Sequence, residues 1–396
     1  MKPAIDGLPR DAALPEHVAL DAWDGGHGVT GTFVQRPGRF ALQRLAKLPR
    51  LMRPGAEADP TDFRHPDVGW ALVLPFTPSL DAAALARAED AEPPFRRLLA
   101  DRGPGAKVLR YRSDYGVLAL FEADGTIVPL AGARDGTEHG ALPDYLLLAG
   151  GPDVLPWSLQ YALGASRCVG RLHLTGTALE RHVSSLVSDR GPGAARYEAP
   201  LVWAVDLGPG DISGLMRRTI AAPIASSFAG DDEMPEHLFL DGGEDPTAGS
   251  AERLCSTLAE RRPALVVTSS HGQTGPLHDP AAMLQRLGVP VGQFGDLVEP
   301  EMVLANWQPN GAVWWAQACC SAGASGHSEY DGLLDPDTDA ARVLHAVAGL
   351  GSHVAPLPTA LLGAEQPLRA FIGHVEPTFD WTISFPWTST PDGQHR

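Results

Sequence analysis

The sequence predicts an α/β protein built on a mostly parallel sheet with helices on both faces. Two observations carry this prediction. Short, continuous apolar runs, which are typical of buried parallel strands, recur along the chain. Segments with the helical spacing of apolar residues separate these runs, as in proteins whose strands and helices alternate. At 396 residues the chain is long enough for two or three domains.

Residues 1–66 are rich in Pro and Gly and only weakly periodic, so we expect an irregular N-terminal segment there. Within it, residues 25–56 carry six basic side chains and no acidic one. Leu42, Leu45 and Leu48 recur at helical spacing, which is compatible with a short basic amphipathic helix. Such a helix either lies on the main body with its charges in water or docks a partner.

Residues 67–195 are expected to form an N-terminal α/β subdomain. Helices are predicted at 80–99, where Pro93 and Pro94 interrupt the pattern, and at 179–187. The apolar runs predict strands at 69–76, 107–111, 117–121, 127–130 and 145–148.

Residues 196–396 repeat the alternation and are expected to form the domain that carries the site. Trp314 and Trp315 are neighbours in one predicted strand, so we expect them on opposite faces of the sheet. The predicted strands are 201–207, 237–240, 264–268, 312–318 and 369–375, and the predicted helices are 212–220, 251–261, 281–287 and 340–350.

Composition excludes several classes of function. The formal net charge of −17 argues against nucleic acid or an anionic membrane as the main partner, because both are bound through basic surfaces. No apolar run approaches the length of a transmembrane helix, and the first residues lack the apolar core of a signal peptide. Four cysteines are too few for a disulfide framework in a chain of this length. We therefore expect a cytoplasmic protein.

Reactive side chains follow two of the predicted strands. The strand at 264–268 runs into Ser269-Ser270-His271-Gly272, and the strand at 312–318 runs into Cys319-Cys320-Ser321-Ala322-Gly323. Functional groups of parallel sheets collect at the carboxyl ends of the strands. A cysteine becomes a strong nucleophile as the thiolate, which a neighbouring imidazole helps to form. The sequence therefore predicts a Cys–His pair at one edge of the sheet.

The SSHG and ACCSAG segments resemble those of the caspase-like cysteine peptidases, a group that includes caspases, metacaspases, gingipains and bacterial CHAT-type proteases. The histidine precedes the cysteine by about 50 residues, and Gln317-Ala318-Cys319 matches the start of the caspase signature. The resemblance spans about residues 68–386 and is nearest to the gingipain-like and CHAT-like members. Three weaker segments also resemble that group: YLLLAGGP at 145–152, VGRL at 169–172 and IGHVE at 372–376.

The resemblance favours Cys320 as the nucleophile, since metacaspases, gingipains and CHAT proteases carry a glycine three residues after it, here Gly323. Cys319 remains the alternative. The same resemblance implies that His271 exchanges the thiol proton, and that the backbone N–H groups of Gly272 and Cys320 bind the oxyanion. A glycine at 272 also lets a substrate backbone approach closely. Spacing identifies no third member of the site.

These observations predict a cysteine endopeptidase that hydrolyses protein substrates through an acyl-enzyme. The alternative is a catalytically silent caspase-fold protein that serves as a binding partner or scaffold. A regulatory protein partner is compatible with either function. Neither H-E-x-x-H nor C-x-x-C occurs, so we expect no metal and no cofactor. Whether an acidic or a basic residue precedes the scissile bond stays open. An acidic loop follows the cysteines and either lines a pocket for a basic side chain or is simply solvated: Asp331, Asp335, Asp337 and Asp339.

Overall fold

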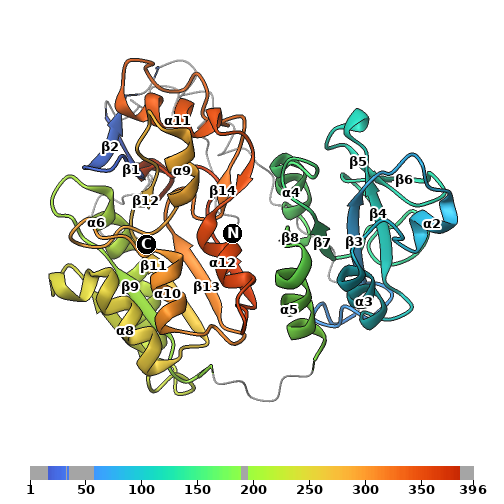
Figure 1. The fold of residues 1–396 in the computed structure, drawn as a ribbon, viewed down its shortest axis with the longest axis horizontal. Helices are drawn as coiled ribbons and strands as arrows, with labels where there is room; N and C mark the ends of the chain where they lie inside the picture. Colours follow the sequence, from blue (N-terminus) through green and yellow to red (C-terminus); the bar gives the residue numbers. More distant parts are fainter. Residues whose placement is uncertain (1–16, 33, 35–57, 189–194, 384–396) are drawn as a thin grey trace, which may run out of the picture. The chain divides into compact units, whose positions relative to one another are not determined.

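The computed structural model describes residues 17–32, 34, 58–188 and 195–383, and it divides into two compact units. Unit 1 is discontinuous and comprises Met1–Pro49 and Gly191–Arg396, whereas unit 2 is Arg50–Arg190. Both units are α/β, as the alternation of apolar runs and helical segments predicts (Figure 1).

Unit 2 is built on a six-stranded sheet in the order β6-β5-β4-β3-β7-β8. Its β3, β4, β7 and β8 run parallel, and β5 and β6 add an antiparallel edge. The strands are β3 Trp70–Pro75, β4 Lys107–Tyr111, β5 Ala119–Phe121, β6 Ile127–Pro129, β7 Tyr145–Ala149 and β8 Cys168–Leu172. The helices are α2 Ala82–Ala86, α3 Pro93–Asp101, η1 Ser113–Tyr115, α4 Trp157–Gly164 and α5 Gly176–Val187.

The helix predicted at 80–99 is two helices in the structure. Asp81 caps the start of α2 by accepting a hydrogen bond from the N–H of Ala84, and α3 begins at Pro93. Proline fits the first turn of a helix, where its missing N–H is not needed, but it disrupts a helix interior. The two prolines therefore start a new helix rather than interrupt one.

Unit 1 centres on a five-stranded parallel sheet in the order β10-β9-β11-β13-β16. Its strands are β9 Leu201–Ala204, β10 Leu238–Asp241, β11 Leu265–Ser269, β13 Val313–Gln317 and β16 Ala370–Ile372. Its helices are α6 Ile212–Met216, the π-helical turn η2 Arg217–Ala221, α7 Ala222–Ala229, η3 Pro246–Gly249, α8 Ala251–Arg261, α9 Pro280–Arg286, α10 Pro300–Asn306, α11 Asp339–Gly349, α12 Pro356–Leu362 and α13 Asp380–Ile383.

Helices cover both faces of this sheet. On one face, Val202 and Val267 pack against Ala225 of α7, and Trp315 joins this cluster. On the other face lie α8, α10 and α12, which contact one another in series (Figure 1). Trp314 points to that second face, where its ring packs against Trp307 at the end of α10. The two adjacent tryptophans therefore lie on opposite faces, as predicted.

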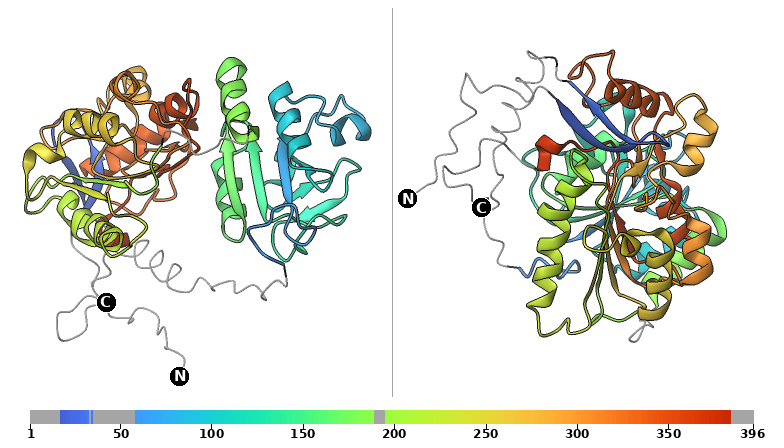
Figure 2. Two further views of the ribbon diagram at one scale, coloured as in Figure 1. Left: turned by 90° about the horizontal axis from the view of Figure 1, so that it is seen from below. Right: turned by 90° about the vertical axis from the view of Figure 1, so that its left-hand side faces the viewer.

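Two strands lie within the N-terminal segment that we expected to be irregular. β1 Val18–Trp23 and β2 Gly28–Gly31 form an antiparallel hairpin, and β1 also pairs in parallel with β12 Gly272–Gln273. Figure 2 shows this hairpin in blue, packed on the C-terminal elements of unit 1. The hairpin belongs to unit 1, so the expected boundary at residue 66 is corrected. The physical reason is a short alternation of buried apolar residues at Val18, Leu20 and Ala22.

Two features complete the description of the fold. A short antiparallel pair, β14 Gly323–Ala324 and β15 His353–Val354, follows the cysteine segment. Within the described ranges, every helix is too short or too polar to span a bilayer. The short basic helix considered for Leu42, Leu45 and Leu48 lies outside the described residues.

Candidate active site

The predicted histidine and cysteines lie at one edge of the unit 1 sheet. β11 and β13 are parallel neighbours in which Ser269 pairs with Gln317. His271 and Cys319 each follow these partners by two residues, so they extend the same register beyond the carboxyl ends of the strands. The N–H of Ser270 still donates to the carbonyl of Gln317, which keeps the two segments together past the sheet.

A carboxylate that the sequence analysis did not identify holds the histidine. The imidazole Nε2 of His271 lies 2.9 Å from Oδ1 and 3.0 Å from Oδ2 of Asp211. Asp211 comes from the loop after β9, at the same edge of the sheet, and caps the start of α6 by accepting the N–H of Ser213. The side chain of His271 is 1% exposed and that of Asp211 is 17% exposed.

Burial disfavours the charged form of Asp211, but hydrogen bonds from His271 and Ser213 and the charge of His271 outweigh it, so the pKa of this carboxyl lies below its usual value. An ionised carboxylate only accepts hydrogen bonds, so Nε2 of His271 must donate. In the neutral ring the other nitrogen, Nδ1, then carries the lone pair. Nδ1 is buried and has no hydrogen-bond partner. The Asp211–His271 pair therefore leaves Nδ1 as the ring nitrogen that is free to exchange a proton with another group.

The two cysteines lie in different local environments, although both are fully buried. The thiol of Cys319 donates to the carbonyl of Gly272 at a distance of 3.0 Å. Burial, the neighbouring Cys320 and the charge of Asp21 raise the pKa of the Cys319 thiol well above its usual value. Cys319 is therefore held as a protonated hydrogen-bond donor, which is a poor state for a nucleophile.

Cys320 lies at the apex of a tight turn. Its φ of +54° is in the left-handed region, which non-glycine residues seldom adopt and which is found mainly where function or packing demands it. The turn is held by the N–H of Gly323, which donates to the carbonyl of Cys320, and by the hydroxyl of Ser321, which donates to that of Ala318. This strained turn singles out Cys320 from Cys319.

We expected the glycine at position 272 to make room for a substrate backbone, but in the structure it makes room for another segment of the protein. A Cβ atom at this position would lie 2.0 Å from the carbonyl oxygen of Cys319. The close approach is therefore that of the protein's own chain and not of a substrate. Gly272 also pairs with Ala22 of the hairpin as part of β12, so its backbone belongs to a sheet ladder.

A chain of buried polar groups lies beside the cysteine turn. Gln317 accepts a hydrogen bond from His374 Nε2 at 3.0 Å and donates to the hydroxyl of Thr378 at 3.2 Å. The hydroxyl and N–H of Thr378 each lie 2.6 Å from the carboxyl of Asp21, a residue of β1. Burial raises the pKa of Asp21 to about 7, although Thr378 and the charge of His271 lower it in part.

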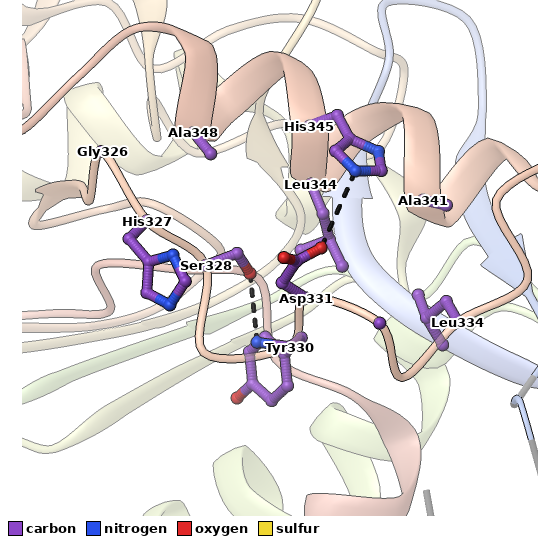
Figure 3. Close-up of a pocket in the computed structure, with 11 residues that line it drawn as sticks. Gly326, His327, Ser328, Tyr330, Asp331, Leu334, Ala341, Leu344, His345 and Ala348 are labelled. Atoms are coloured by element: carbon purple, nitrogen blue, oxygen red, sulfur yellow. Dashed lines mark hydrogen bonds and ion pairs between the residues drawn. The ribbon is translucent and has the colours of Figure 1, made fainter. Parts of the chain in front are cut away.

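The acidic loop after the cysteines is mostly solvated, and one of its members lines a cavity. Asp331 joins His327, Tyr330 and His345 around a cavity of about 170 Å³ between this loop and α11 (Figure 3). Nε2 of His345 lies 3.9 Å from Oδ1 of Asp331. The other three acids make local contacts: Asp335 accepts the N–H of Asp337, and Asp339 pairs with Arg342.

One group of side chains in unit 2 has the composition of a metal site. The ligand atoms of Glu122, Asp124 and His139 all lie within 4.8 Å of one another. Each of them already has protein partners, since Lys107 pairs with Glu122, and Thr126 donates to Asp124. Among the described residues, no such group includes His271 or a cysteine.

Comparisons with known proteins place no constraint on the function: no family model, curated protein sequence or solved structure matches the chain significantly. The site rests on its own geometry. The residue that sequence reasoning missed, Asp211, does carry a signal. It follows a predicted strand of the same sheet, as His271 and the cysteines do, and Asp-x-Ser before an apolar segment is a helix-capping pattern.

Proposed function

We propose that the protein is a cysteine endopeptidase of the caspase-like class, with Cys320 as nucleophile, His271 as proton carrier and Asp211 as the residue that orients His271. The single observation that carries the proposal is the buried Asp211–His271 pair with its unpartnered Nδ1, at the sheet edge that also bears the cysteine turn. A thiol nucleophile, an imidazole base and a carboxylate that orients the base form one of the combinations that can hydrolyse a peptide bond through a covalent intermediate.

The chemical steps follow from these groups. Nδ1 of His271 takes the proton of the Cys320 thiol, and the sulfur attacks the carbonyl carbon of the scissile peptide. Asp211 stabilises the imidazolium that forms and fixes its orientation. The imidazolium then gives its proton to the leaving amine, and the carbonyl re-forms as a thioester. Water hydrolyses the thioester, with His271 accepting one of its protons, and the thiol is regenerated.

The proposal includes its cellular setting. We propose protein substrates, a cytoplasmic location and control by a regulatory protein partner, while nucleic acid and membrane are not proposed as partners because the net charge is −17.

The test compares two neighbouring cysteines. Cys320→Ala is expected to abolish cleavage of a mixed peptide library, read by mass spectrometry, because it removes the attacking sulfur. Cys319→Ala is the matched control and is expected to keep most of the activity, because that thiol serves as a donor to Gly272. An inactive Cys319→Ala together with an active Cys320→Ala would exchange the two roles.

One observation favours a second function, that of a catalytically silent binding or scaffold protein. His271, Cys319 and Cys320 are all buried, so no substrate reaches them in this conformation. Incubation of the purified chain separates the two functions, because a peptidase is expected to give fragments that disappear in Cys320→Ala. If no fragments form and no library peptide is cleaved under any condition that exposes the thiols, the scaffold function is favoured.

A further inference from the structure

The β1–β2 hairpin lies directly on the proposed catalytic pair. A Cβ atom on Gly28, at the start of β2, would lie 2.5 Å from Oδ2 of Asp211 and 3.1 Å from Nε2 of His271. The indole of Trp23, at the end of β1, lies 5.7 Å from the imidazole of His271, measured between ring centroids. Only a residue without a side chain fits at position 28, so the hairpin backbone itself closes over the Asp211–His271 pair.

The inner side of the hairpin also closes over the cysteines. Val18, Leu20 and Val29 are at most 1% exposed, and they belong to the same apolar cluster as Cys319 and Cys320. The hairpin therefore replaces solvent over both halves of the site. A peptide substrate needs the same space, because its carbonyl must reach the sulfur while its leaving nitrogen reaches the imidazole.

The hairpin also brings a carboxyl group close to the site. Asp21, on the same strand of the hairpin, is held by Thr378 and lies close enough to His271 and Cys319 to influence both charges. Its negative form disfavours a second negative charge on the neighbouring sulfur of Cys319. The hairpin thus lowers both the access to the thiol pair and the tendency of Cys319 to ionise.

The strand ladder that joins the hairpin to β12 is short. β1 pairs with β12 through two positions, Ala22 with Gly272 and Trp23 with Gln273. The hairpin is also held by hydrogen bonds from Thr274 to the carbonyl of Trp23 and between Asp21 and Thr378, by a β-bridge between Leu20 and Phe379, and by apolar packing. None of these bonding partners belongs to a strand of the five-stranded sheet, so the hairpin can open locally while that sheet stays folded.

We propose that the β1–β2 hairpin is an intramolecular inhibitory segment, which keeps the site latent until its displacement exposes His271 and Cys320. This inference rests on the proposed peptidase function and adds its regulation. It also explains how His271 and Cys320 can be the reacting groups of a peptidase although both are fully buried in this structure.

The test loosens the hairpin and measures thiol exposure. Val29→Ala shortens one buried side chain of the hairpin, and Val202→Ala makes the same change in the opposite core cluster of unit 1 as a matched control. The rate of iodoacetamide labelling is measured for Cys319 and Cys320 together, with Cys255 as the internal reference. Cys255 is buried in α8 and has no part in the hairpin cluster.

Val29→Ala is expected to raise the labelling rate of Cys319 and Cys320 roughly tenfold relative to that of Cys255. Truncation of a buried Val removes packing from the closed hairpin and shifts the equilibrium between its closed and open forms by about that factor. Val202→Ala is expected to accelerate all three cysteines alike, through global unfolding of unit 1. Equal acceleration of all three in Val29→Ala, or none, would overturn the inference. Circular dichroism of both variants confirms that they remain folded.

Peptide cleavage measured on the same samples separates this inference from the proposed function. If both hold, cleavage by Val29→Ala rises in step with the labelling of the cysteine pair. If Cys319 and Cys320 are labelled selectively but no peptide is cleaved, the hairpin does cover the cysteines and the proposed peptidase function is refuted. Full cleavage by the unaltered chain, unchanged in Val29→Ala, supports the peptidase and refutes the inhibitory role of the hairpin.

Discussion

The carboxyl of Asp21 makes the stability of unit 1 depend on pH in a measurable way. Burial raises its pKa from 3.8 to about 7, and the hydrogen bonds from Thr378 and the charge of His271 offset only part of this effect. Unfolding returns the carboxyl to water, where its pKa falls back to its ordinary value. Between the two pKa values the folded protein therefore keeps a proton that the unfolded chain releases.

The sign and size of the effect follow from this difference. Because the folded state binds the extra proton, the free energy of unfolding falls as the pH rises through the window. The contribution is fully present below about pH 4 and is lost as the pH passes the folded pKa of about 7. A gap of roughly three pKa units, at about 1.4 kcal/mol per unit, corresponds to about 4 kcal/mol.

Asp21→Asn isolates this contribution. The amide oxygen of Asn still accepts the N–H of Thr378, but the side chain no longer binds a proton. We expect the wild-type chain to lose about 1.4 kcal/mol per pH unit relative to the variant between about pH 5 and 7. Urea unfolding followed by tryptophan fluorescence measures this, since Trp203 and Trp314 are buried in unit 1. Titrating groups that do not interact with Asp21 are common to both proteins and cancel in the comparison. Parallel stability curves for the two proteins across this range would refute the reasoning.

Three further changes have defined outcomes. Asp211→Asn keeps a side chain that can cap the helix but removes the charge beside His271. The turnover number for peptide cleavage is therefore expected to fall about a hundredfold or more, with little change in KM. An unchanged turnover number would show that Asp211 has no part in the reaction. Gly272→Ala places a methyl group against the carbonyl of Cys319 and is expected to cost about 1–3 kcal/mol in urea unfolding, whereas a neutral effect would show that the chain relaxes freely there. Arg110→Ala removes a fully buried guanidinium that pairs with the partly exposed Asp90 in unit 2, and it is expected to cost that unit about 2–5 kcal/mol, read from its melting by circular dichroism; a loss below about 1 kcal/mol would contradict this argument.

Much of unit 1 could be predicted from the sequence because its three central strands are largely buried. The runs at 201–207, 264–268 and 312–318 are apolar at nearly every position, as covered parallel strands require, and the structure places β9, β11 and β13 within them. Since parallel strands end at one edge, the position of His271 beside the cysteine segment followed from the same pattern.

The hairpin and Asp211 carry only weak local signals in the sequence, and their places in the site depend on contacts between distant parts of the chain. β1 has one partner strand nearby in sequence, but its other partner, β12, contains only Gly272 and Gln273. No pattern in two residues marks a strand. Asp211 is one of many acidic residues in a chain of this charge, and only the fold brings it to His271.

The discontinuity of unit 1 also affects the order in which its parts are synthesised. The hairpin is made before its partner β12, which follows only after about 240 more residues, an interval of roughly 10–50 s at typical rates of translation. Throughout that interval Val18, Leu20 and Val29 have no native surface against which to pack. The nascent chain therefore depends on late, long-range contacts, and a ribosome-bound fragment that ends before β12 is expected to expose these side chains to chaperones.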